Sequence, residues 1–174
     1  MLQWVMVLGI ATGMRTMTPI AVVCWFMWEA VFPVTGWTAW TANGISVGVF
    51  TLFALGEYYG DTLPQTPNRT SVFPLIARIG FGALVGALSA AAMEEPAAGG
   101  VILGVIGALI GAYGGMWLRL RLAKMMGRDL PVAVLESALA LGLAVLAMHE
   151  LRVMLTRQEH EAWMLLRQGL VAFG

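Results

Sequence analysis

Charge is scarce in this sequence. Only 11% of its 174 residues are Asp, Glu, Lys or Arg, whereas 59% are hydrophobic. A soluble domain carries about 25% charged and about 45–50% apolar residues, so the composition argues against an ordinary soluble fold and indicates an integral membrane protein. The net charge is zero, which gives no indication of a nucleic-acid partner.

Cysteine and the motifs of soluble enzymes are also nearly absent. Cys24 is the only cysteine, which excludes an internal disulfide and a site built from several thiolates. We interpret it as a small buried hydrophobic residue. The sequence has no G-x-S-x-G motif, no P-loop and no H-E-x-x-H pattern. We therefore expect no catalytic residues, no metal and no cofactor.

Five apolar stretches are long enough to cross a membrane, which takes about 20 residues of helix. They cover residues 2–30, 41–59, 72–93, 97–118 and 131–148. They predict an all-α, polytopic membrane protein with one domain, residues 1–148. Residues 149–174 are too polar to span, and their loose apolar stripe predicts an amphipathic tail that lies on the membrane or on a partner.

The charges between these stretches predict the orientation. The bases Arg119, Arg121, Lys124 and Arg128 follow the fourth stretch, whereas Glu94 and Glu95 precede it. Positively charged loops stay in the cytoplasm. Counting back over the four spans that precede the basic loop puts the N-terminus in the cytoplasm of a bacterium, with the protein in its inner membrane. The same count puts the tail outside.

An arginine and a proline interrupt the first stretch. Pro19 cannot donate to the carbonyl of Arg15, four residues earlier, so the helix is expected to break there. Arg15 is 11 residues from Trp4, or about 17 Å of helix, which predicts a position near mid-membrane. A charge at that depth is expensive and must face protein or water. The break is therefore either a polar functional centre or the place of a structural ion pair.

Further ionisable residues are expected in the half of the membrane near the basic loop. The predicted cluster consists of Arg15, Glu57, Asp61, Arg78 and Glu136. Such a cluster relays protons or binds a cation in some membrane proteins, and in others its charges only neutralise each other and fix the packing. Arg69, in the proline-rich segment after Asp61, is expected to contact a lipid headgroup or Asp61.

Glycines recur at intervals that allow close helix packing. They are Gly82 and Gly86 in the third stretch, and Gly100, Gly104, Gly107, Gly111 and Gly115 in the fourth. Small residues spaced by four let helix backbones approach each other, as in a glycine zipper. The fourth helix is therefore expected either to pack centrally or to form a contact between copies of the chain.

Two motifs are similar in sequence: GDTLP at residues 60–64 and GRDLP at residues 127–131. Each precedes an apolar helix with an ionisable residue, Arg78 or Glu136. The pattern favours a duplicated helical hairpin, an arrangement typical of transporters, although five residues also match by chance.

Three segments resemble the bacterial membrane-protein family catalogued as domain of unknown function 4126. They are GMRTMTP at residues 13–19, GEYYGDTLPQTPNRTS at 56–71 and GRDLPVAVLESALAL at 127–141. The resemblance runs over residues 9–148 and implies a membrane location. It draws attention to Arg15, Asp61, Arg69 and Glu136, and it implies no particular activity or substrate.

The leading hypothesis for function is a transporter or channel for a small solute or ion, coupled to protons. Five spans enclose little volume, so such a protein is expected to form a homo-oligomer. The alternative is a non-catalytic accessory or assembly subunit of a larger membrane complex. A lipid-acting intramembrane enzyme, using the acidic pair and Arg69, comes third.

Overall fold

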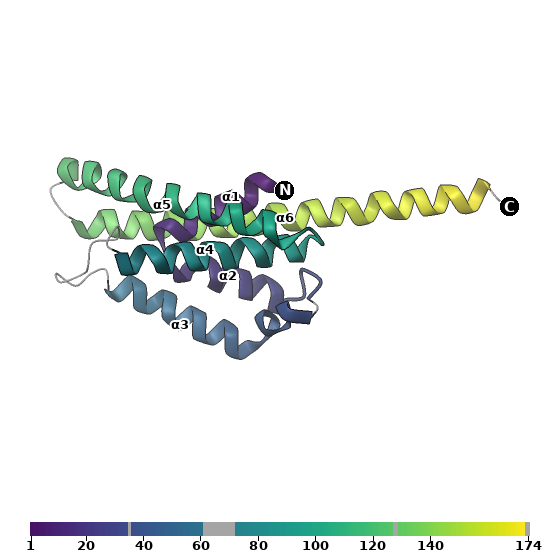
Figure 1. The fold of residues 1–174 in the computed structure, drawn as a ribbon, viewed down its shortest axis with the longest axis horizontal. Helices are drawn as coiled ribbons and strands as arrows, with labels where there is room; N and C mark the ends of the chain where they lie inside the picture. Colours follow the sequence, from purple (N-terminus) through teal and green to yellow (C-terminus); the bar gives the residue numbers. More distant parts are fainter. Residues whose placement is uncertain (35, 61–71, 127–128, 173–174) are drawn as a thin grey trace.

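The computed structural model describes residues 1–34, 36–60, 72–126 and 129–172. Every regular element in these ranges is helical, which confirms the predicted all-α class (Figure 1). The elements are α1 (Leu2–Met14), α2 (Met17–Trp28), the 3-10 helix η1 (Gly36–Ala42), α3 (Gly44–Gly60), α4 (Val72–Ala92), α5 (Ala97–Met126) and α6 (Asp129–Ala172). Asp61 and Arg69 lie outside the described residues.

The chain reverses direction between α1 and α2, so the expected first span is not a single crossing. Helix α1 runs parallel to α5, because Gly9 faces Gly104 and Gly107, and Gly13 faces Ala108 and Ala112. Helix α2 returns antiparallel to α3: Thr18 contacts Tyr58 near its start, and Trp25 contacts Thr51 near its end. The two short helices therefore form a hairpin inside the bundle (Figure 1).

The middle of the bundle is a glycine-lined stack of α4, α5 and α1. A Cβ added at Gly82 would lie 2.7 Å from the Ala108 Cβ and 2.7 Å from the Gly104 carbonyl oxygen. One added at Gly9 would lie 2.6 Å from the same carbonyl oxygen. Gly86 and Gly100 face each other in the same way, as do Gly107 with Met6 and Gly111 with Ile10. These glycines of α5 therefore pack against helices of their own chain.

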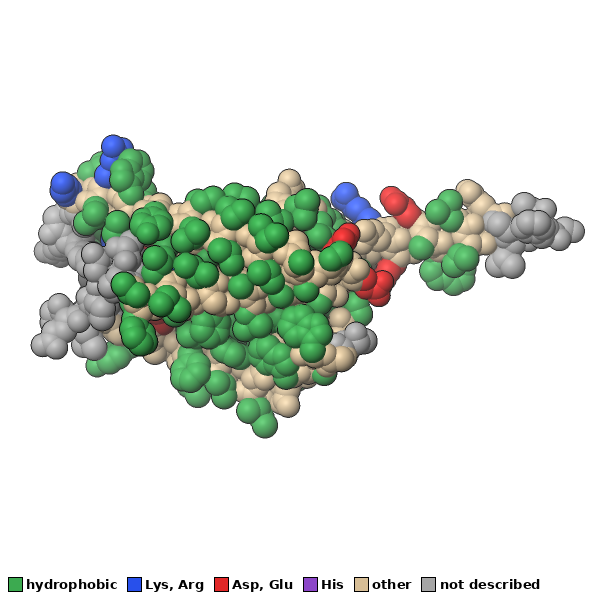
Figure 2. Space-filling model, viewed as in Figure 1, with side chains coloured by type: hydrophobic (Ala, Val, Ile, Leu, Met, Phe, Trp, Pro, Cys, Tyr) green, Lys and Arg blue, Asp and Glu red, His purple; other side chains and the backbone are tan. Residues whose placement is uncertain are grey.

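Three described helices are long and apolar enough to cross a membrane: Val72–Ala92, Ala97–Leu122 and Pro131–Gln168. A fourth crossing results if η1 and α3, which are bent by 65°, are counted as one span. Hydrophobic side chains cover much of the outside of the bundle, as Figure 2 shows for one face. The structure thus shows three to four candidate crossings in place of the five expected, because the α1–α2 hairpin takes the place of the first.

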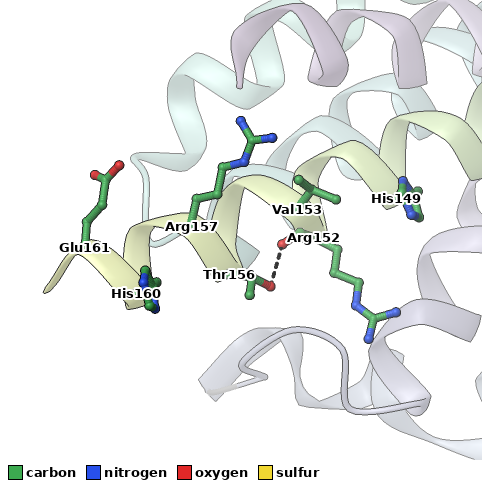
Figure 3. Close-up of a pocket in the computed structure, with 7 residues that line it drawn as sticks. All are labelled: His149, Arg152, Val153, Thr156, Arg157, His160 and Glu161. Atoms are coloured by element: carbon green, nitrogen blue, oxygen red, sulfur yellow. Dashed lines mark hydrogen bonds between the residues drawn. The ribbon is translucent and has the colours of Figure 1, made fainter. Parts of the chain in front are cut away.

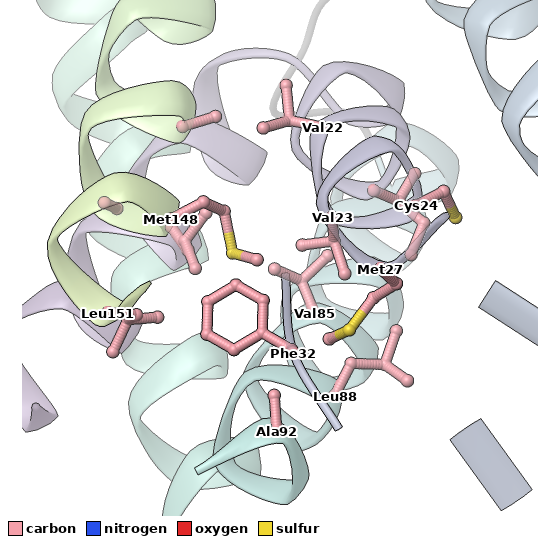
Figure 4. Packing of buried hydrophobic residues seen from close by; sticks show 14 of the residues in the cluster. Val22, Val23, Cys24, Met27, Phe32, Val85, Leu88, Ala92, Met148 and Leu151 are labelled. Atoms are coloured by element: carbon pink, nitrogen blue, oxygen red, sulfur yellow. The ribbon is translucent and has the colours of Figure 1, made fainter. Parts of the chain in front are cut away.

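A second core lies at the end of the bundle where α2 and α4 finish. The Phe32 side chain points into the space between α2, α4 and α6, where it meets Met27, Leu88 and Leu151 (Figure 4). Met1 and Trp4 also pack against this cluster. The beginning of α1 and the end of α2 are therefore at the same end of the molecule.

The basic segment of α5 lies at the opposite end from Met1. Helices α1 and α5 are parallel, and Arg119, Arg121 and Lys124 occupy the last turns of α5. The sequence placed the N-terminus on the same side as these bases, by counting spans. The hairpin changes the number of spans before the bases of α5, because α2 returns the chain to the end of the bundle at which α1 starts.

Helix α6 continues well past the other helices (Figure 1). It has 44 residues, or about 66 Å of helix. No break marks the domain boundary expected at residue 148, and the segment expected to be a separate tail prolongs the same helix. Its side chains from Thr156 to Gln168 are all exposed.

Candidate functional site

The break between α1 and α2 is local to Arg15. Arg15 has extended backbone angles, φ −139° and ψ 112°, and its N–H still donates to the Ala11 carbonyl. Helical angles resume at Thr16, and α2 begins at Met17. Pro19 therefore occupies the first turn of the new helix, where a missing N–H costs nothing because first-turn N–H groups have no helical acceptor.

Glu57 of α3 binds the start of α2 with both carboxylate oxygens. The Thr16 N–H donates to Oε1 and the Met17 N–H donates to Oε2, each at 2.9 Å. The beginning of a helix carries a partial positive charge, so a carboxylate is favoured there. Tyr58, the next residue of α3, adds a 2.8 Å hydrogen bond between its hydroxyl and that of Thr18. These contacts attach α3 to the tip of the hairpin.

Arg15 is buried beside these contacts, with 1% of its surface exposed. Its Nη2 donates to the carbonyl of Ala133 in α6 at 3.2 Å. Its guanidinium carbon lies 5.4 Å from the centre of the Tyr58 ring, a distance that favours a cation–π contact. Arg15 thus connects the hairpin tip to both α6 and α3.

Glu136 lies in a second polar group between α5 and α6. It is 7% exposed, and its Oε2 is 4.0 Å from Nη1 of Arg119. Its Oε1 lies so close to α5 that a Cβ at Gly115 would be 3.2 Å away. A cavity of about 60 Å³ adjoins the pair, which leaves room for only a few water molecules.

Arg119 is the partner that sequence reasoning missed, because it was assigned to a cytoplasmic loop. The helix continues through it to Met126. One signal was present: Arg119 is seven residues before the end of α5 and Glu136 is seven residues after the start of α6, so an antiparallel pair of helices brings them together.

The structure brings some of the predicted cluster together. Arg15 and Glu57 both lie at the hairpin tip, where Glu57 binds the residue after Arg15, and Glu136 lies one turn after the Ala133 carbonyl that Arg15 binds. Arg78 is buried in α4, with 5% of its surface exposed. Whether Asp61 or Arg69 joins them falls outside the described residues.

The structure places Arg15 relative to the bases of α5. Its neighbour Met14 lies against Gly115 of α5, one helical turn before Arg119. Arg15 is therefore about 6 Å of helix from the level of Arg119, the first base of α5. The depth of Arg15 estimated from its distance to Trp4 assumed that the first stretch crosses the membrane as one continuous helix. The structure has the α1–α2 hairpin there.

A larger concavity of about 540 Å³ runs beside the part of α6 that leaves the bundle. The lining side chains all come from this one helix, and Arg152, Thr156 and His160 are among them (Figure 3). Because one helix supplies the whole lining, the concavity is open to the surroundings on the side away from α6. Among the residues that the structure describes, no group of three or more His, Cys, Asp or Glu side chains is placed to hold a metal.

Comparison with protein-family models, with curated proteins and with solved structures found no match for this chain. The resemblance to the domain of unknown function 4126 stays a prediction.

Proposed function

We propose that the protein is a transporter or channel for a small solute or ion, and that Glu57 couples transport to protons. The observation that carries the proposal is the Glu57 carboxylate bound by both oxygens to the start of α2. Broken helices whose ends meet charged groups inside a membrane domain are typical of transporters.

Protonation of Glu57 would loosen the hairpin tip. The ionised carboxylate is attracted to the start of α2 and accepts two charge-assisted hydrogen bonds. A neutral carboxylic acid loses the attraction between charge and helix dipole and is a weaker acceptor. Proton uptake would therefore favour separation of α3 from the hairpin.

Arg15 would transmit this movement to α6. It holds the hairpin tip to Ala133, one turn before Glu136. A displacement of the tip therefore changes the surroundings of Glu136 and Arg119. The narrow cavity beside that pair is where water would first gain access when the helices separate.

The basic end of α5 is proposed to face the cytoplasm, by the preference of Lys and Arg for that side. In that orientation Met1, the acidic turn with Glu94 and Glu95, and the exposed part of α6 would be outside. The inner membrane of a bacterium is the proposed location. This orientation replaces the cytoplasmic N-terminus derived from five spans.

A homo-oligomer is part of the proposal. The glycine stack leaves little open space between α1, α4 and α5, so a solute path within one chain would need the hairpin to move. Exposed apolar side chains around the bundle offer contacts to lipid or to further copies.

Proteoliposomes test the coupling directly. A pH-sensitive dye inside the vesicles would report proton entry driven by a potassium diffusion potential, for the wild type, Glu57→Gln and Arg157→Gln. We expect proton entry above that of protein-free vesicles for the wild type and for Arg157→Gln, whose side chain is exposed on α6. Glu57→Gln should lose it, because the amide cannot take up a proton.

Two results would contradict the proposal. Wild-type vesicles that match protein-free vesicles would exclude proton-coupled transport under a membrane potential. Equal rates for the wild type and Glu57→Gln would remove Glu57 from the mechanism. Circular dichroism and gel filtration of each variant would show that a lost rate does not reflect lost folding.

One observation favours the alternative, an accessory or assembly subunit. The exposed part of α6 carries a large apolar group, with Trp163 70% and Leu165 69% exposed. Native mass spectrometry of the gently solubilised full chain, and of a chain ending at Thr156, would separate the two functions. A defined complex with a larger membrane protein, lost on truncation, would establish the accessory role, whereas a homo-oligomer unaffected by truncation would argue against it.

A further inference from the structure

A membrane-facing groove runs between the last turns of α5 and the first turns of α6. The cavity beside Glu136 and Arg119 lies in it, and apolar residues make up the remaining walls: Leu118, Leu122, Val132, Leu135 and Leu139. Leu135 and Leu139 are about half exposed on the outer surface of the bundle. Lipid chains would therefore contact the groove directly.

Positive charge gathers where this groove opens at the end of α5. Arg119 lines it, and Arg121 and Lys124 follow within two turns. No acidic residue occurs in α5, and among the side chains that the structure describes Glu136 is the one acid that lines the groove. Figure 2 shows basic side chains at this end of the molecule.

An aromatic side chain fixes the level of the membrane surface here. The Arg121 guanidinium carbon lies 4.0 Å from the centre of the Trp117 ring, and Trp117 is 55% exposed. Tryptophan favours the headgroup region of a bilayer. The bases of α5 are thus near headgroup level, and Leu139, about one helical turn deeper than Glu136, lies towards the acyl chains.

We propose that this groove binds one acidic phospholipid. Its phosphate would contact Arg119, whose planar guanidinium suits phosphate oxygens, with Arg121 and Lys124 adding attraction. One acyl chain would lie along Leu118, Leu135 and Leu139. Basic sites between transmembrane helices on the cytoplasmic side bind acidic headgroups in the same way.

The walls favour a lipid over a free phosphate ion. Five apolar side chains line the groove, and a free ion gains nothing from them. A lipid matches both the basic and the apolar side chains of the groove, because its phosphate lies beside the bases and its hydrocarbon beside the leucines. The groove shares Arg119 and Glu136 with the proposed transport path but none of the contacts of Glu57, so lipid retention is tested separately from proton entry.

Native mass spectrometry from nanodiscs would test the site. The protein would be reconstituted in equal amounts of phosphatidylglycerol and phosphatidylcholine, and the lipids retained after release would be counted. We expect the wild type to retain phosphatidylglycerol selectively. Arg119→Gln should lower that selectivity about fivefold, the effect of one basic residue near an acidic membrane surface.

A second variant separates a groove-bound lipid from general attraction to the basic end. Leu118→Trp fills the groove and leaves every base in place, so it should also abolish selective retention. Arg157→Gln, which removes a base from the opposite end, should behave like the wild type. Circular dichroism would confirm the folding of each variant.

Three results would overturn the inference: equal retention of both lipids by the wild type, unchanged selectivity in Arg119→Gln, or unchanged selectivity in Leu118→Trp. Displacement of the lipid by excess inorganic phosphate would also overturn it, since it would identify a phosphate site that needs no hydrocarbon.

Discussion

The two charged residues at the hairpin tip are both bound by backbone groups. Glu57 accepts from the N–H groups of Thr16 and Met17, and Arg15 donates to the Ala133 carbonyl. The break supplies the N–H groups, since it leaves the beginning of α2 without helical acceptors. At the scale of single residues, the N–H groups that the break leaves free therefore stabilise the Glu57 carboxylate, and the carboxylate in turn satisfies those N–H groups.

Arg15→Gln should destabilise the folded protein. The shorter amide side chain does not reach Ala133, and a hydrogen bond from a charged donor contributes about 2 kcal/mol. We expect the free energy of unfolding, measured by SDS titration, to fall by about that amount. Arg157→Gln is the matched control and should stay within about 0.5 kcal/mol of the wild type, as exposed substitutions do.

An unchanged or increased stability of Arg15→Gln would contradict this account. It would mean that the desolvation of the guanidinium costs at least as much as its contacts contribute.

Among the helices, α5 packs closely against two others, α4 and α1. Its glycines are divided between two partners: Gly100 and Gly104 face α4, Gly107 and Gly111 face α1, and Gly104 also lies against Gly9 of α1. Close approach on both sides leaves no room for side chains, so the sequence of this helix is constrained by packing over several turns. The polar pair of Arg119 with Glu136 begins where the glycines end.

Gly86→Ala and Gly80→Ala make a matched test in one helix. A Cβ at Gly86 would collide with the carbonyl oxygen of Gly100, a backbone atom that moves only with its helix, whereas one at Gly80 meets nothing within 4 Å. Gly86→Ala should lower the unfolding free energy by about 1–3 kcal/mol, the usual cost of overpacking. Gly80→Ala should be neutral or stabilising by about 0.5 kcal/mol, because alanine favours helix.

Equal effects of the two substitutions would contradict the close packing of α4 on α5. Thermal unfolding midpoints, followed by circular dichroism in one detergent, would provide the comparison.

The helices were predictable from the sequence where an apolar run sets their length, as in α4; the start of α5 was predictable too, but its end at Met126 was not. The break near Arg15 was predictable as well, because Pro19 cannot follow an uninterrupted turn. The reversal of direction at that break was not, since it depends on Glu57 and Ala133, which are 41 and 118 residues from their partners. The pair of Arg119 with Glu136 was missed because the end of an apolar run is not the end of a helix.

At the scale of the whole molecule, the hairpin decides which ends share a side. Met1 packs near Leu151, and the exposed part of α6 leaves the bundle at that same end. The bases of α5 are at the other end. If η1 and α3 count as one span, four crossings separate Met1 from residue 168, where the sequence count gave five.

Labelling of single-cysteine variants would test which ends of the molecule share a side of the membrane. Cys24 is fully buried, so the native chain gives little background with a maleimide that does not cross membranes. On intact spheroplasts, Leu2→Cys and Gln158→Cys should be labelled, whereas Lys124→Cys should react only after permeabilisation. Labelling of Leu2→Cys together with Lys124→Cys would contradict the hairpin.

The hairpin also has a consequence for biogenesis. Helices α1 and α2 have 13 and 12 residues, each shorter than the about 20 needed to cross a bilayer. Their surroundings come from α5 and from Ala133, which the ribosome makes much later. The segment synthesised first would therefore be the last to reach its final position. Helices α1 and α2 would remain at the membrane surface until the later helices are in place to pack against them.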